Sequence, residues 1–258
     1  MLTDLQNKLS AIQRGELDEQ TVYARSFAAR RQLIPAPGPV FHCPVCENWH
    51  LKFLPFGLNG RRNATCPTCG SLERHRYMWL HLQDVHRVWQ RRLSILHVAP
   101  EPCIGRRLSE FANIDYLSID LYNEGAALNM DLTDLTLPDA RFDMVICSHV
   151  LEHIERDDLA IVEMARVLRP RGKLVVMVPV DRKLEQTYED AAITDPIERH
   201  KAFGHPYHVR VCGTDYPDRM RNAGFDVSVY DSKRMSPMAR HIERINKTLL
   251  FDGVKRPD

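Results

Sequence analysis

The chain has 258 residues, of which 44% are hydrophobic and 27% are charged, and its formal net charge is +1. This length and composition are typical of one main domain with its own core and a small appended module. The longest apolar run, residues 174–180, is far too short to cross a membrane, and the N-terminus lacks the apolar stretch of a signal peptide. We therefore expect no membrane span and a cytoplasmic location.

The first 38 residues indicate a helical arm followed by a linker. Leu2, Leu5, Leu9 and Ile12 recur at helical spacing among good helix formers, and prolines at 35, 37 and 39 cannot continue a helix. One or two amphipathic helices are predicted here, and an amphipathic arm of this kind can serve as a homodimer interface. A domain boundary is expected near residue 38.

Four of the seven cysteines form two C-x-x-C pairs. Cys43 and Cys46 are separated from Cys66 and Cys69 by 19 residues, which is the spacing of a four-cysteine zinc knuckle. Four thiolates close a tetrahedral site and leave no open position, so the predicted zinc is structural. We expect residues 39–92 to hold this knuckle and a helix running from residue 71 to about 90, with Ser71 as its N-cap.

Arginines and aromatic residues are concentrated around this module, and residues 1–92 carry a net positive charge while the remainder is net negative. Such a neighbourhood can grip an anionic partner, including RNA. It is equally typical of a solvated helix face whose aromatic side chains point into the core. The sequence leaves both interpretations open.

From residue 93, short apolar runs alternate with helical patterns. Strands are predicted at 94–99, 116–120, 142–147 and 173–179, with a helix at 157–168 between the last two. A further helix at 216–223 and edge strands at 224–230 and 247–254 are expected. This order predicts an α/β, doubly wound, Rossmann-like, mostly parallel sheet with helices on both faces over residues 93–258.

Two segments carry a family resemblance. The segments are Phe142-Asp-Met-Val-Ile-Cys-Ser-His-Val-Leu-Glu-His-Ile154 and Arg166-Val-Leu-Arg-Pro-Arg-Gly-Lys-Leu-Val-Val-Met177. With them, residues 93–254 resemble the class I S-adenosylmethionine (SAM)-dependent methyltransferases of type 11. The resemblance implies SAM as cofactor, with ribose bound by Asp120, adenine flanked by Asp131 and Leu132, and the methionine part near Ser148 and His149. The implied cofactor-binding set is Ala99, Pro100, Glu101, Asp120, Leu121, Asp131, Leu132, Ser148 and His149.

The sequence departs from this family at the first loop. The close-approach glycines are replaced in His97-Val-Ala-Pro-Glu-Pro-Cys-Ile-Gly105, where Ala99 has to let the backbone come near the cofactor.

Methyl transfer to oxygen or nitrogen can require a general base, and histidines supply three candidates. His149 follows the fourth predicted strand, while His205 and His208 lie in a polar segment, 181–215, that is predicted to form the acceptor site or a lid. Glu189 with these histidines is an alternative divalent-metal set.

We interpret the chain as a methyltransferase acting on an oxygen or nitrogen of a small-molecule or carbohydrate-like acceptor. One alternative is an RNA or other nucleic-acid methyltransferase that uses the basic knuckle. Another is a non-catalytic SAM-binding or zinc-dependent interaction protein, which the altered glycine loop would permit.

Overall fold

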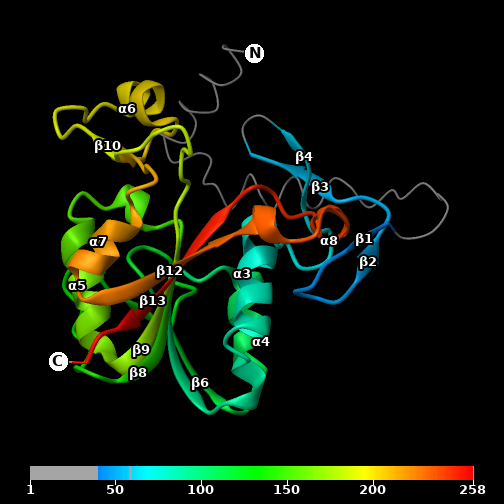
Figure 1. Cartoon of the computed structure of the whole chain (residues 1–258), viewed down its shortest axis with the longest axis horizontal. Coiled ribbons are helices and arrows are strands. Elements are labelled where there is room, and N and C mark those ends of the chain that lie inside the picture. Colours follow the sequence, from blue (N-terminus) through cyan, green and yellow to red (C-terminus); the bar gives the residue numbers. More distant parts are fainter. Residues whose placement is uncertain (1–39, 58–59, 258) are drawn as a thin grey trace.

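The computed structural model describes residues 40–57 and 60–257 (Figure 1). The predicted helical arm at 1–38, with its dimerisation role, lies outside this range. Within the described residues, no helix is both long and apolar enough to cross a membrane.

A seven-stranded sheet forms the centre of the larger domain, in the order β12-β13-β9-β8-β5-β6-β7. Neighbouring strands pair in parallel from β9 to β7, whereas β13 pairs antiparallel with both β9 and β12. The predicted doubly wound α/β fold is confirmed. The strands are β5 (Leu93–Val98), β6 (Ile114–Asp120), β7 (Leu128–Asn129), β8 (Phe142–Ser148), β9 (Leu168–Met177), β12 (Phe225–Asp231) and β13 (Leu249–Lys255).

Helices cover both faces of the sheet (Figure 1). On one face lie α3 (Glu73–Asp84) and α4 (Pro102–Ser109), and on the other lie α5 (Asp157–Val167) and α7 (Pro217–Asn222). The alternation along β8 explains this arrangement, because Met144 and Ile146 join the core under α3 and α4 while Val145 and Cys147 join the core under α5.

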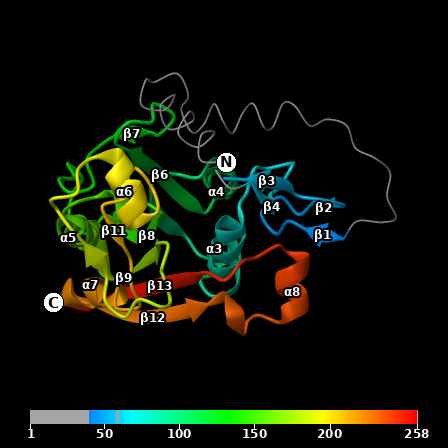
Figure 2. The ribbon, with the colours of Figure 1, turned by 90° about the horizontal axis from the view of Figure 1, so that it is seen from above.

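The cysteine module consists of two antiparallel hairpins, β1 (Phe41–His42) with β2 (Trp49–His50) and β3 (Leu54–Phe56) with β4 (Arg61–Thr65). Seen from above, it lies beside α3 and near α8 (Pro237–Ile242) (Figure 2). The fully buried Arg76 of α3 joins the parts, since its guanidinium donates to the backbone carbonyls of Ala64 and Ser71 on one side and of Glu243 and Arg244 on the other. The knuckle is thereby fixed against the α/β domain.

The segment 181–215 contains β10 (Tyr188–Glu189), α6 (Pro196–Phe203) and β11 (Arg210–Val211). Arg210 is 2% exposed and donates to the carbonyls of Leu151, Ile154 and Glu155, so the segment is held against the 3₁₀ turn η2 (Leu151–His153). It reaches the region that follows the carboxyl end of β8. A role as lid stays a prediction.

Three local predictions were wrong. The helix α3 ends at Asp84 rather than near residue 90, because Arg87 adopts a left-handed φ of 49° before the 3₁₀ turn η1 (Val88–Gln90). Its N-cap position is held by Leu72, while the Ser71 hydroxyl instead lies 3.2 Å from Cys43 Sγ. The strand β13 is internal, between β9 and β12, and is not an edge strand.

Candidate functional site

The strand order reverses at β5, with β6 on one side and β8 on the other. Ligands of doubly wound sheets bind outside the carboxyl ends of the strands at such a reversal. Here Ala99, directly after β5, has a φ of +46°, a left-handed conformation that normally favours glycine. The backbone shape expected of a close-approach loop is therefore present although its glycine is replaced.

At the end of β6, Asp120 is half-buried. Its Oδ1 accepts backbone hydrogen bonds of 2.8 Å from both Tyr122 and Asn123, which fixes the carboxylate, while Oδ2 has no hydrogen-bond partner among the described residues. The neighbouring Leu121 and Tyr122 side chains are 46% and 86% exposed. A fixed acceptor oxygen beside exposed apolar surface can receive a ribose hydroxyl and pack against a base.

Among the other predicted cofactor residues, Asp131 and Ser148 have polar groups that can serve a ligand, whereas Leu132 belongs to the core. Asp131 is exposed, and hydrogen bonds from the Thr133 backbone and hydroxyl lower the pKa of its carboxyl. Ser148 is 5% exposed and its Oγ is buried without a hydrogen-bond partner among the described residues, an orphaned group of the kind that a ligand satisfies. By contrast, the Leu132 side chain is 5% exposed and packs in the sheet core.

Glu101, at the altered loop, turns its carboxylate into the protein. Its Oε2 accepts a hydrogen bond of 2.9 Å from His97 Nε2, and Oε1 lies 3.7 Å from His75 Nε2 on α3. Burial opposes ionisation, but His75 and His97 together hold the pKa of Glu101 well below its usual range. This carboxylate therefore ties the loop to α3, while the neighbouring Pro100 is half-buried beside it.

His149 follows β8 with a left-handed φ of 56°, fixed by a 2.8 Å hydrogen bond from its backbone N–H to the carbonyl of Met177. Its Nδ1 lies 3.0 Å from Oε1 of the buried Glu152, and its side chain is 24% exposed. Burial and the positive charge of Arg74 lower the pKa of His149, so the ring is neutral at physiological pH and can accept a proton.

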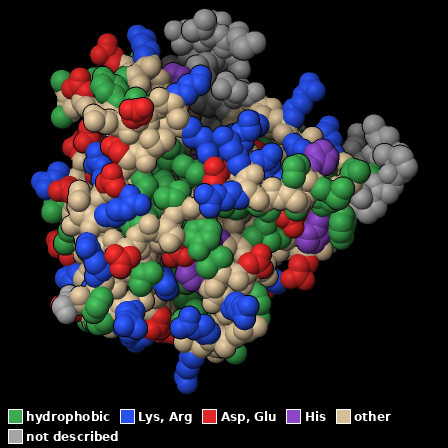
Figure 3. Space-filling model, in the orientation of Figure 1, with side chains coloured by type: hydrophobic (Ala, Val, Ile, Leu, Met, Phe, Trp, Pro, Cys, Tyr) green, Lys and Arg blue, Asp and Glu red, His purple; other side chains and the backbone are tan. Residues whose placement is uncertain are grey.

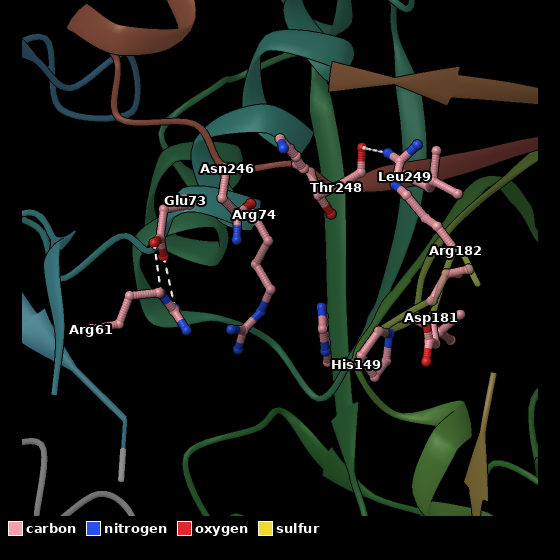
Figure 4. A pocket seen from close by; sticks show the side chains of 13 residues that line it. Arg61, Glu73, Arg74, His149, Asp181, Arg182, Asn246, Thr248 and Leu249 are labelled. Carbon is pink, nitrogen blue, oxygen red and sulfur yellow. Dashed lines mark hydrogen bonds and ion pairs between the residues drawn. The ribbon is translucent and has the colours of Figure 1, made fainter. Parts of the chain in front are cut away.

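A cavity of about 430 Å³ opens beside His149, between the knuckle and the sheet (Figure 4). Cations outnumber acids in its lining by four to two, and the space-filling view shows Lys and Arg side chains gathered between α6 and the β3–β4 hairpin (Figure 3). The charged lining residues are Arg61, Arg74, Arg182, Lys247, Glu73 and Asp181.

Two of these cations already have partners. Arg61 binds both oxygens of Glu73 at 2.7 and 2.9 Å, and Arg182 binds both oxygens of Asp231 at 2.7 Å. Arg74 differs, because its Nε is buried without a hydrogen-bond partner and no carboxylate of the described residues lies within ion-pair distance of its guanidinium. Arg74 therefore presents a charge beside His149 that no direct ion pair within the described residues holds, a feature that sequence analysis did not separate from the other arginines.

The four cysteines of the knuckle meet at one point. Their Sγ atoms all lie within 4.8 Å of one another, with Cys43 to Cys69 at 3.6 Å and Cys46 to Cys66 at 3.7 Å. Sulfur atoms about 2.3 Å from a tetrahedral zinc ion are roughly 3.8 Å apart, whereas a disulfide requires about 2.05 Å. The donor set and its spacing fit zinc.

Two histidines of the 181–215 segment are brought to η2. His205 and His208 gather with His153, and one ring nitrogen of each lies within 4.8 Å of the others. Glu189 does not join them, since its carboxylate pairs with Arg210 and Arg219 at 2.9 Å. The alternative metal set that includes Glu189 is therefore wrong as proposed.

Comparison with known proteins adds to this geometry. A family model described as a methyltransferase domain matches residues 109–176. A ubiquinone/menaquinone biosynthesis C-methyltransferase of Paraburkholderia xenovorans is 28% identical over 129 residues, which cover 50% of this chain and 47% of that protein. A protein of the same description from Hydrogenovibrio crunogenus is 42% identical over 62 residues, which cover 22% of this chain and 24% of that protein.

Among solved structures, the YcgJ protein from Bacillus subtilis aligns with 67% of this chain and 100% of its own length, at 15% identity and a TM-score of 0.45. The chain covers 47% and 24% of the length of the two curated relatives, so it spans about half or less of the curated relatives it matches. The matched family model and the two curated relatives are described as methyltransferases, and parts of the α/β domain are similar to them in sequence.

Proposed function

We propose that this protein transfers the methyl group of SAM to an oxygen or nitrogen atom of an anionic small molecule. The observation that carries the proposal is the cavity beside His149, where a neutral imidazole and the Arg74 guanidinium, which forms no direct ion pair with the described residues, line one space. SAM supplies a methyl group on a sulfonium, which an aligned nucleophile displaces in line.

On the cofactor side, Asp120 would accept a ribose hydroxyl at its unpartnered Oδ2, and Ser148 would satisfy its buried hydroxyl on the bound molecule. Asp131 would accept from the adenine amine, beside the exposed Leu121. The left-handed Ala99 would let the loop after β5 approach closely.

On the acceptor side, Arg74 and Lys247 would bind a carboxylate or phosphate of the substrate, because their charges have no carboxylate partner in the described chain. His149 would take the proton from the acceptor atom, with Glu152 holding its ring in place. Zinc in the four-cysteine site would keep the knuckle folded, so that Arg61 and Glu73 stay on the cavity wall.

Calorimetric titration of the zinc-loaded protein with SAM and S-adenosylhomocysteine tests the cofactor half. Binding is expected for wild type and for Asp226→Ala, an exposed acid on β12, and is expected to be lost or strongly weakened in Asp120→Ala. Absence of binding to folded wild-type protein would overturn the proposal. Where binding is found, transfer of labelled methyl from SAM to fractions of a cell extract separates small molecules from RNA and protein, and label in RNA alone would contradict the proposed acceptor class.

A further inference from the structure

The proposed methyl transfer assigns no role to the cluster of His153, His205 and His208. Ring centroids are 5.8 Å apart for His153 and His205, 4.8 Å for His153 and His208, and 4.7 Å for His205 and His208. Three imidazoles whose ring nitrogens lie within 4.8 Å of one another form the donor set of a transition-metal site.

The backbone around Tyr207 orients two of the rings. The carbonyl of Tyr207 lies 3.1 Å from His153 Nδ1 and can only accept, so His153 carries its proton on Nδ1 and has a lone pair on Nε2. The Tyr207 N–H donates to His205 Nδ1 at a longer 3.3 Å, so His205 can offer a lone pair to an ion only when this hydrogen bond is released. A carbonyl that fixes the distal nitrogen of a histidine is the usual support of a metal-ligating imidazole.

The two chain segments that carry the histidines are held together independently of any ion. Val209 N–H donates to the carbonyl of Glu152 at 2.9 Å, and Arg210 caps the carbonyls of Leu151 and Ile154. The His153 side of the cluster is exposed, while His205 and His208 are half-buried. Three protein nitrogens with one side open to solvent leave coordination positions for water or a ligand.

We propose that His153, His205 and His208 bind a divalent transition-metal ion, separate from the zinc of the knuckle. Three imidazole donors suit Zn²⁺, Co²⁺, Ni²⁺ or Fe²⁺. Binding requires the ligand atoms to close from within 4.8 Å to about 3.3 Å of one another, which a shift of the 205–208 turn can supply. The site adjoins His149 through the buried Glu152, whose Oε2 has no hydrogen-bond partner within the described part of the chain. Its use in anchoring an acceptor oxygen rests on the proposed function, whereas metal binding does not.

The test measures metal content by mass spectrometry after dialysis of the full chain against Zn²⁺. Wild type should hold about one equivalent more than His153→Ala or His208→Ala. The matched control is His200→Ala, a histidine of α6 outside the cluster, which should retain the wild-type content. Metal at the knuckle, or at the buried His81, His86 and Asp252, would be common to all four proteins and would cancel in the comparison. Equal metal content in wild type and both variants would overturn the proposal.

A second measurement does not depend on how the variants fold. Co²⁺ added to wild-type protein whose cysteine site is already filled with Zn²⁺ should give weak visible absorption of a nitrogen- and oxygen-ligated ion, without a thiolate charge-transfer band. No such absorption would contradict the site. If the protein binds the metal but not SAM, the histidine site stands and the proposed methyltransferase function is rejected. Failure of the metal-site proposal and failure of the proposed function are therefore distinguishable.

Discussion

Consecutive residues at the start of α3 serve four different parts of the molecule, because a helix turns by about 100° per residue. Glu73 pairs with Arg61 of the knuckle, Arg74 faces the cavity, His75 faces Glu101, and Arg76 binds carbonyls of both modules. Among them only Arg74 has a buried guanidinium nitrogen without a hydrogen-bond partner.

Replacing Arg74 with Gln should raise KM for the acceptor roughly 10- to 100-fold, since a charged hydrogen bond contributes about 1.5–3 kcal/mol. The measurement is steady-state kinetics on the acceptor found in the extract screen. Arg106→Gln on the exposed face of α4 is the matched control and should leave KM unchanged. An equal effect of both substitutions would reject Arg74 as an acceptor ligand.

His149 should set the acid limb of the pH–rate profile. Its pKa is lowered by burial and by Arg74, while Glu152 and Glu101 act in the opposite direction, so kcat should be flat near neutrality and fall only below pH 6.5. Removing the charge in Arg74→Gln should move this limb to higher pH. His149→Asn keeps a residue that tolerates the left-handed φ of 56° and should lower kcat roughly 10²- to 10⁴-fold. Persistence of the limb in His149→Asn would exclude His149 as the base.

Sequence could propose the identity of single candidate residues but not their partners. The spacing of the cysteines predicts a shared metal, and the Sγ atoms do converge. Nothing in the sequence distinguishes Arg74 from Arg76, because the direction of each side chain depends on where α3 lies between the knuckle and the sheet. Likewise, nothing in the sequence singles out His153, since its neighbours come from residues 205–208.

At the scale of elements, the local sequence pattern predicted most strands of the sheet. It failed for elements whose position depends on tertiary contacts. Strands β5, β6, β8 and β9 were predicted because buried parallel strands are short apolar runs. The helix α4 was not predicted, because prolines at 100 and 102 are typical of a loop, whereas proline is well tolerated at the first turn of a helix. The internal position of β13 follows from pairing with residues more than 70 positions away, which no local pattern reports.

One buried cluster links α3 to β13. The Oδ2 atom of Asp252 lies 3.0 Å from Nε2 of both His81 and His86, and all three side chains are at most 7% exposed. Burial opposes ionisation of Asp252, but the hydrogen bond with His81 and the close approach of His86 hold its pKa well below the usual range. The cluster is therefore an internal, pH-sensitive connection between a helix and the sheet.

Asp252→Asn should lower the free energy of unfolding by about 1.5–3 kcal/mol near neutrality. Because the folded-state pKa is depressed, this contribution is present above the unfolded-state pKa near 3.9 and is lost as pH falls through the folded-state value. Denaturant unfolding between pH 7 and pH 2 should thus show the variant and wild type converging in acid. A gap that stays constant down to pH 2 would show that the carboxylate charge is not the source of the stabilisation.

At the scale of the whole molecule, the acceptor cavity belongs to neither module alone. The knuckle and α3 supply Arg61, Glu73 and Arg74, whereas His149 and the segment that includes Arg182 come from the α/β domain. The predicted cofactor residues lie entirely in the α/β domain, at or after the carboxyl ends of β5, β6, β7 and β8. Cofactor binding and acceptor binding should therefore depend differently on the folding of the knuckle.

Removal of zinc by a chelator should separate these two dependences. Without the ion, four clustered thiolates repel one another and the two short hairpins have little core of their own, so residues 40–70 should lose amide protection in hydrogen exchange. Affinity for SAM should change by no more than about twofold, while KM for the acceptor should rise as the Arg61 side of the cavity is lost. Readdition of Zn²⁺ should restore both protection and KM. If chelation abolished SAM binding and left the knuckle protected, the ion would have to act in the α/β domain, and the division of labour between the modules would be wrong.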